Sequence, residues 1–285
     1  MTSALQRLPK HTVKLTITIP WSEVKDTYQK VLDQVVAGAE VPGFRKGKAP
    51  KKIVEEKIDK SHIYEEVIKQ LVPDIYANAL KEHNLKPIVS PRISVIAASE
   101  GKDWQFEALT CEQPEVKLKN YKQEIAKLKG AKKIWVPGSA PAKQDNNEKK
   151  GVQLSETLRV LLNETEVEIP DLLIEEQANK KLSDLIDQVR QLGMTIEQYL
   201  MSKGLTSQQL RAQYAKEAEE TLKLEFILEK IADEEKITVS NSEIDEALAA
   251  IKDEKQKQAL QSQKYYISMI LRRQKTLDSL TKPIV

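Results

Sequence analysis

The sequence is poor in the residues that carry most redox, metal and nucleophilic chemistry. It has one cysteine, Cys111, and three histidines among 285 residues. A single cysteine excludes an intramolecular disulfide, and it leaves too few ligands for a structural zinc site. His11, His62 and His83 have no carboxylate or cysteine at ligand spacing, so they are interpreted as surface residues. We predict no metal site, no cofactor and no catalytic residue.

Long apolar segments are also missing. No run of about 18 apolar residues is present, which excludes an evident transmembrane helix. Residues 1–14 lack the apolar stretch of roughly 7–15 residues that marks a secretory signal peptide. These absences predict a cytoplasmic protein without a membrane partner.

Aromatic residues make up 5% of the chain and glycine occurs 9 times, whereas charged residues reach 31%. Such a composition favours long amphipathic helices with wide solvated faces over a compact enzyme. The 45 basic and 43 acidic residues leave a net charge of +2. Any affinity for nucleic acid must therefore come from a local basic patch.

The first part of the chain mixes strand and helix patterns. Apolar and polar residues alternate over 13–19, which predicts a half-buried strand that ends at Pro20. Helical spacing follows from Ser22 to Gly38, again over 51–58, and after Ser61 through Pro73, which should kink or divide that helix. Residues 87–98 and 103–111 predict two strands joined by a glycine turn. We predict an α+β domain over residues 1–118.

The remainder changes character. Residues 119–150 are lysine-rich, and Pro, Gly, Ser and Asn are frequent near residues 136–147, so we predict a linker with at most a short helix at its start. Only helical patterns follow, with starts at Ser155 and Pro170 and capping boxes at Thr206 and Ser240. We predict an extended all-α domain over residues 151–285.

The loop over residues 43–50 holds the most informative cluster of side chains. Its prolines and glycines exclude a helix or a central strand. Phe44 stands beside Arg45 and Lys46, with Lys48 nearby and no acidic residue between them. An exposed aromatic residue among cations suits docking, because the ring can fill an apolar pocket while the cations meet phosphates or carboxylates. The other interpretation is that Phe44 folds back as an anchor and the cations are simply solvated.

A nucleotide site in the same loop is excluded by its spacing. Gly43, Gly47 and Lys48 resemble a phosphate-binding loop only faintly, since the spacing is one residue short and Ala49 stands where a magnesium-binding hydroxyl is needed.

The loop sequence Gly43-Phe44-Arg45-Lys46-Gly47-Lys48-Ala49-Pro50 resembles the ribosome-binding signature of trigger factor, a bacterial chaperone family. Residues 80–87 and 113–118 are similar to the helix-to-strand junction and the domain exit of that family. The resemblance implies that Phe44, Arg45 and Lys46 contact ribosomal protein and RNA at the exit tunnel. Gly43, Gly47 and Lys48 would complete the site, with Lys48 as a supporting contact.

The family usually carries an FKBP-like prolyl-isomerase domain after this exit, and the short linker here cannot form one. The resemblance therefore implies a short form without isomerase activity. Residues 166–174 are similar to the segment that opens the family's helical arms, which receive unfolded chains. Exposed apolar and methionine-rich surface would serve that purpose. The candidate client-binding residues are Met194, Ile196, Tyr199, Leu200, Met201, Leu205, Tyr265, Tyr266, Ile267, Met269 and Ile270.

Two alternatives stay open beside this ribosome-associated chaperone for nascent polypeptides. An RNA-binding or ribosome-biogenesis factor would use the basic loop and the lysines of the linker, although stacking aromatic residues are scarce. A reduced prolyl isomerase would need a compact β domain with an aromatic pocket. Full-length members of the family can dimerise off the ribosome, so a weak homodimer also remains open.

Overall fold

The computed structural model describes residues 1–38, 44–45, 47, 50–57, 60–131, 146–249, 260–261 and 263–281. The chain divides into two compact units, Met1–Gln113 and Pro114–Val285. They are called the sheet unit and the helical unit below. Among the described helices, none is both long and apolar enough to cross a membrane.

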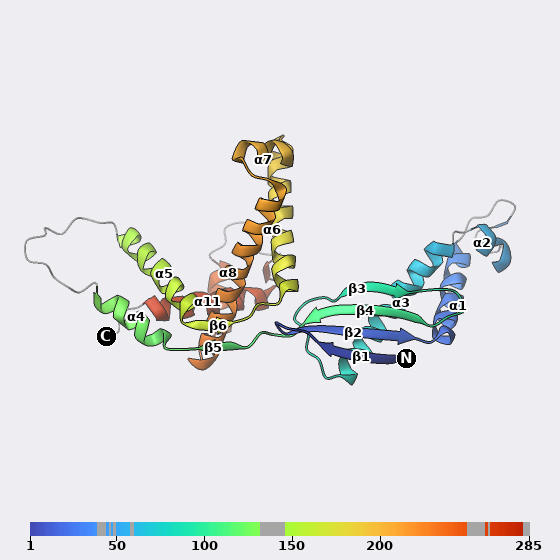
Figure 1. Ribbon diagram of the computed structural model, residues 1–285, viewed down its shortest axis with the longest axis horizontal. Coiled ribbons are helices and arrows are strands. Elements are labelled where there is room, and N and C mark those ends of the chain that lie inside the picture. The colour runs from blue at the N-terminus through green and yellow to red at the C-terminus, as the bar shows by residue number, and fades with distance from the viewer. Residues whose placement is uncertain are drawn as a thin grey trace, which may run out of the picture. The chain divides into compact units, whose positions relative to one another are not determined.

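The sheet unit is built on four antiparallel strands (Figure 1). They are β1 (Thr2–Arg7), β2 (Thr12–Ile19), β3 (Arg92–Ala97) and β4 (Trp104–Cys111), and their order in the sheet is β1-β2-β4-β3. Every second residue of β2 is buried, as its alternating sequence predicts. Strand β1 was not expected, because its own apolar pattern is weak and its pairing with β2 defines it.

Three helices complete this unit: α1 (Trp21–Gly38), α2 (Lys51–Lys57) and α3 (Lys60–Glu82). The apolar faces of α1 and α3 pack with the strands in one core, which includes the fully buried Trp104 and Phe106. Helix α3 continues through Pro73 as one element, so Pro73 does not divide it, and the alternative of a kink stays a prediction. The predicted β3–β4 hairpin is confirmed, and Gly101 takes a positive φ of 81° in its turn.

The helical unit contains seven described helices and one short two-stranded ribbon. The elements are β5 (Val116–Leu118), α4 (Tyr121–Ala131), α5 (Asn146–Asn163), β6 (Thr165–Val167), α6 (Asp171–Gln191), α7 (Ile196–Lys203), α8 (Ser207–Glu234), α9 (Asn241–Ala249) and α11 (Lys264–Thr281). Strands β5 and β6 pair antiparallel. Only helices had been expected after residue 150, and β6 corrects that expectation.

One core joins the base of the helical unit. Tyr121 and Ile125 of α4, Leu161 of α5, and Ile227 and Ile231 of α8 are buried together. Helices α6 and α8 lie side by side, and α7 lies at the end of this pair away from the β5–β6 ribbon (Figure 1). The α6–α8 pair with α7 is called the arm below.

The predicted fold class, an α+β domain followed by a mainly helical one, is confirmed. The predicted boundary at residue 118 and the linker over 119–150 stay predictions. Within that stretch, α4 is ordered through the buried side chains of Tyr121 and Ile125, while residues 132–145 lie outside the described part of the chain.

Candidate functional site

The loop between α1 and α2 holds the candidate docking residues. The side chain of Phe44 is 43% exposed, and Arg45 beside it is exposed as well. Phe44 is absent from the described core of the sheet unit. An aromatic ring and a guanidinium group therefore face solvent next to each other. Gly43, Lys46 and Lys48 lie outside the described residues.

Gly47 fixes how closely this loop approaches helix α1. Its φ is +71°, in the left-handed region that side chains rarely adopt. A Cβ atom at this position would lie 2.7 Å from the carbonyl oxygen of Ala37. Both constraints favour glycine, so the second glycine of the loop motif has a structural reason.

The two helices that flank the loop are tied together at its base. The Tyr28 hydroxyl of α1 donates a hydrogen bond of 2.9 Å to Glu55 of α2, and Lys51 forms an ion pair with Asp33. Val54 is fully buried against apolar side chains of both helices. Burial, followed by the bond to Glu55, raises the pKa of the Tyr28 hydroxyl well above its ordinary value. The base of the loop is therefore fixed by packing, one hydrogen bond and one ion pair.

The arm is built from well-capped helices. Thr195 opens α7 by accepting a hydrogen bond of 3.3 Å from the Gln198 backbone, and Thr206 opens α8 by accepting one of 3.1 Å from Gln209. Each glutamine side chain accepts a bond from the backbone of its threonine in return. These capping boxes define sharp turns at both ends of α7. The box predicted at Thr206 is confirmed.

The far end of the arm exposes large apolar side chains. Met201 is 82% exposed and Leu192 is 77% exposed, with Met194 also exposed. These three are called the arm-tip residues below. The remaining candidates nearby are half-buried or buried, namely Ile196, Tyr199, Leu205 and Leu200. Leu192 was not among the sequence candidates, although a leucine at a helix end directly before Gly193 was a usable signal.

A second group of candidates lies on α11. Tyr265, Tyr266 and Ile270 are exposed, whereas Ile267 is buried with Ile244 and its neighbours on α9. The hypothesis of client contact therefore rests on the exposed members of α11 and on the arm-tip residues. Leu200 and Ile267 are buried, so their side chains contribute to the packing of the helical unit.

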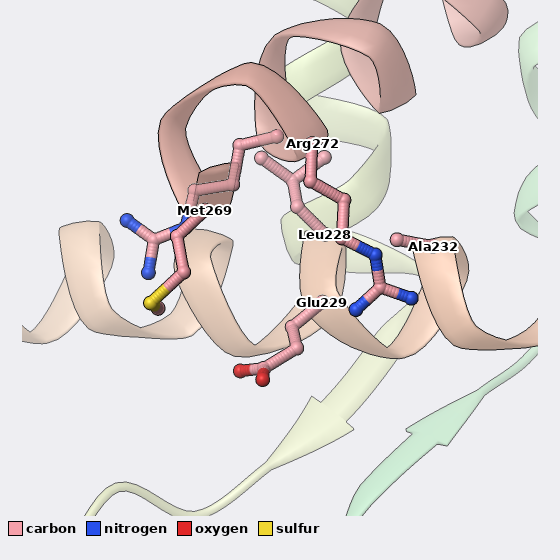
Figure 2. Close-up of a pocket in the computed structure, with 6 residues that line it drawn as sticks. Leu228, Glu229, Ala232, Met269 and Arg272 are labelled. Atoms are coloured by element: carbon pink, nitrogen blue, oxygen red, sulfur yellow. The ribbon is translucent and has the colours of Figure 1, made fainter. Parts of the chain in front are cut away.

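Met269 lines a small cavity between α8 and α11 (Figure 2). The cavity has a volume of about 30 Å³ and is also bordered by Leu228, Glu229 and Arg272. Arg272 is already bound to Asp233 at 2.6 Å. Small-molecule sites measure roughly 300–1,000 Å³, so this cavity is too small to be one.

A serine–histidine contact occurs in the sheet unit but does not form a catalytic relay. The Ser3 hydroxyl lies 2.8 Å from His83 Nε2 and donates a bond of 2.6 Å to Glu82. In a nucleophilic triad the carboxylate orients the imidazole, whereas here it binds the serine. Among the described residues, no group of three His, Cys, Asp or Glu side chains could hold a metal ion.

Family models match both parts of the chain. Residues 1–133 match the model described as bacterial trigger factor protein, and residues 140–282 match the model of the trigger factor C-terminus. Only residues 134–139 separate the two matches, which leaves no room for a further domain between them.

Curated relatives match a part of the chain. The trigger factor of Natranaerobius thermophilus is 36% identical over 122 residues, which are 43% of this chain and 27% of that protein. The trigger factor of Staphylococcus aureus is 38% identical over 122 residues, again 43% of this chain and 28% of the relative. The matched segment thus spans about a quarter of the length of these relatives.

A solved structure supports the fold along almost the whole chain. It comes from work on promiscuous substrate recognition in folding and assembly activities of the trigger factor chaperone. The similarity has a TM-score of 0.64 at 15% sequence identity and covers 98% of this chain and 99% of that one. The chain belongs to the trigger factor family, in a form whose N-terminal and C-terminal parts follow each other without the isomerase domain.

Proposed function

We propose that this protein is an ATP-independent chaperone of the bacterial cytoplasm. It docks at the ribosomal exit tunnel through Phe44, Arg45 and Lys46 and holds emerging nascent chains on exposed apolar surface of the helical unit. Membership of the trigger factor family supports this proposal. The observation that carries it is the exposed Phe44–Arg45 pair on a fixed base, at the position of the family's ribosome-binding signature.

The chemistry of the loop suits a ribosomal surface. A half-exposed aromatic ring gains free energy when it enters an apolar pocket on a protein. A guanidinium group beside it can bind a carboxylate or a phosphate with paired hydrogen bonds. The base needs little reordering on binding because Val54, the Tyr28–Glu55 bond and the Lys51–Asp33 pair already hold the flanking helices.

Holding without ATP requires weak and adaptable contacts. The arm-tip residues include two methionines, whose flexible thioethers adapt to varied apolar partners. The three side chains carry no charge and offer no directional bond, so binding stays broad and reversible. Gly43, Gly47 and Lys48 complete the proposed docking site, and no prolyl-isomerase activity is proposed for this chain.

Co-sedimentation with 70S ribosomes tests the docking step. Wild type should pellet with ribosomes, and the triple variant Phe44→Ala, Arg45→Ala, Lys46→Ala should lose at least about tenfold in affinity, as expected when an interface anchor is removed. The matched control removes one exposed apolar residue and two cations elsewhere in the sheet unit, by Ile88→Ala with Lys81→Ala and Lys86→Ala.

Equal binding of wild type and triple variant would reject the loop as the docking site. If the control variant also loses binding to ribosomes, the loss in the triple variant reflects the general charge of the protein and not the loop. Tight binding of the wild type to naked RNA, falling steeply with salt, would favour an RNA-binding factor instead. Turnover of a prolyl-peptide substrate would revive the isomerase alternative.

A further inference from the structure

A surface cavity of about 360 Å³ lies in the sheet unit, beside the base of the docking loop. This volume falls within the range of roughly 300–1,000 Å³ that is typical of ligand sites. Four segments form its walls: α1, α2, the start of α3 and the turn between β3 and β4. The residues that line it are Trp21, Lys25, Tyr28, Gln29, Glu55, Tyr64, Glu100 and Gly101.

Three aromatic side chains shape this cavity. The rings of Tyr28 and Tyr64 are in contact, with their centroids 5.2 Å apart, and Tyr64 packs in turn on the buried Trp104 at 5.5 Å. Trp21 contributes a further half-exposed ring. Because Tyr28 is 7% exposed and anchored in the core, its ring is held in place before any ligand arrives.

Two carboxylates, from Glu55 and Glu100, and one ammonium group, from Lys25 of α1, line this cavity. Glu55 of α2 accepts the Tyr28 hydroxyl at 2.9 Å, and Glu100 of the hairpin turn faces Tyr64. Burial first, and then Glu100 and Glu55, raise the pKa of the Tyr64 hydroxyl above its ordinary value, as expected where negative charge gathers. Lys60 reaches Glu100 at 3.6 Å in an exposed, loose ion pair.

We propose that this aromatic cavity binds the side chain of an arginine that belongs to a polypeptide. A guanidinium group is planar, so it can stack on the ring faces while its N–H groups donate to Glu55 and Glu100. The site is separate from the docking loop itself and from the apolar surface of the arm.

The charge arrangement selects the source of the arginine. Free arginine carries an α-ammonium and an α-carboxylate, whose interactions with Glu55 and Glu100 oppose each other and which lose hydration on binding, whereas an arginine within a chain is flanked by neutral amides. A polyamine offers ammonium groups without a planar face, so it would lose the stacking on Trp21 and Tyr64. A peptide-borne arginine is therefore the occupant that both the rings and the carboxylates favour.

Isothermal titration of the full chain tests this proposal. The probe is the blocked tripeptide acetyl-Gly-Arg-Gly-amide, and its matched control carries citrulline, which is neutral and of nearly the same shape. We expect the arginine peptide to bind at least about tenfold more tightly than the citrulline peptide, since charge-assisted hydrogen bonds are roughly twice as strong as neutral ones. Spermidine and free arginine should both bind more weakly than the arginine peptide.

Substitutions of the lining carboxylates locate the binding site. Glu55→Gln and Glu100→Gln should each weaken the arginine peptide by about fivefold. Glu65→Gln removes the same charge from α3, one residue from Tyr64 and outside the cavity lining, and should leave the affinity unchanged. Glu100 is exposed in a turn, so its substitution remains informative even if Glu55→Gln disturbs the loop base.

Several results would overturn the proposal. Equal affinity for the arginine and citrulline peptides would exclude guanidinium recognition. Unchanged binding in both glutamine variants, or an equal loss in Glu65→Gln, would place the peptide elsewhere. Spermidine binding as tightly as the peptide would exclude a polypeptide-specific site. The titration contains no ribosomes, so it can fail while the proposed docking function stands.

Discussion

The two units of this chain arrange their candidate functional residues in different ways. In the sheet unit the candidate docking residues are neighbours in the sequence, and they stand on a loop whose base is fixed by Val54 and the Tyr28–Glu55 bond. In the helical unit the exposed apolar residues come from α11 and from the far end of the arm, at positions far apart in the sequence. A local motif suits one defined partner, and a dispersed apolar surface suits many different ones.

This difference is what the proposed function would require of each unit. A ribosome presents one constant surface, so a pre-organised aromatic and cationic cluster gains specificity at low entropic cost. Unfolded chains share no sequence, so their binding surface must rely on apolar area without directional bonds. Each unit also has its own core, and the predictions below test whether the two can be disturbed separately.

The largest expected effect is on the stability of each unit by itself. Ile63 of α3 and Ile231 of α8 are both fully buried, in different cores. Ile63→Ala should lower the free energy of unfolding of the sheet unit by about 2–5 kcal/mol, and Ile231→Ala should do the same to the helical unit. Hydrogen exchange followed by mass spectrometry in low urea resolves the two units peptide by peptide.

Each substitution serves as the control for the other. Protection should fall in the unit that carries the change and persist in the other, because no residue belongs to both cores. If either substitution lowers protection equally throughout the chain, the two units unfold as one cooperative body and the comparison fails.

A smaller effect is expected from the arm tip. Changing Leu192, Met194 and Met201 together to serine should weaken the suppression of client aggregation by about tenfold, since apolar contact worth on the order of 1–2 kcal/mol is lost. Binding to 70S ribosomes should not change. Light scattering of a chemically unfolded client and co-sedimentation measure the two activities separately.

The sheet unit offers a matched control for that variant. Val95 and Ile96 of β3 are each 52% exposed, so Val95→Ser with Ile96→Ser removes similar apolar surface from the other unit. This control should still suppress client aggregation as well as wild type does. If it falls as far as in the arm-tip variant, clients bind both units and the division of labour between them is wrong.

Local patterns in the sequence predicted most of the sheet unit. The alternation over β2, the helical stripe of α1 and the glycine turn before β4 each lie within a short window, and the structure confirms them. Strands β1, β5 and β6 were missed. The last two have three residues each and pair across a long stretch of chain, so neither shows a period of its own.

Exposure on the helical unit could not be predicted in the same way. Leu200 is buried and Met201 is 82% exposed, although they are adjacent and both apolar. Tyr266 and Ile267 on α11 differ in the same manner. Packing between distant helices decides these outcomes, whereas the character of the docking loop lies in consecutive residues. Glu55 and Glu100 likewise come to line one aromatic cavity only on folding.

The smallest expected effect is a pH dependence confined to the helical unit. Hydrogen bonds from Lys275 and the Ser240 backbone lower the pKa of Glu243 to about 2, from an ordinary value of 4.5. Because the folded value is the lower one, the stability from this group is complete above pH 4.5 and is lost as the pH falls toward 2.

The variant Glu243→Gln tests this contribution. In urea melts followed by hydrogen exchange, it should make the free energy of unfolding of the helical unit less dependent on pH over that window and leave the sheet unit unchanged. Glu246→Gln, which removes the same charge from α9 without touching Lys275, should behave as wild type, and an equal flattening there would assign the effect to general charge on α9 instead of the Lys275 contact.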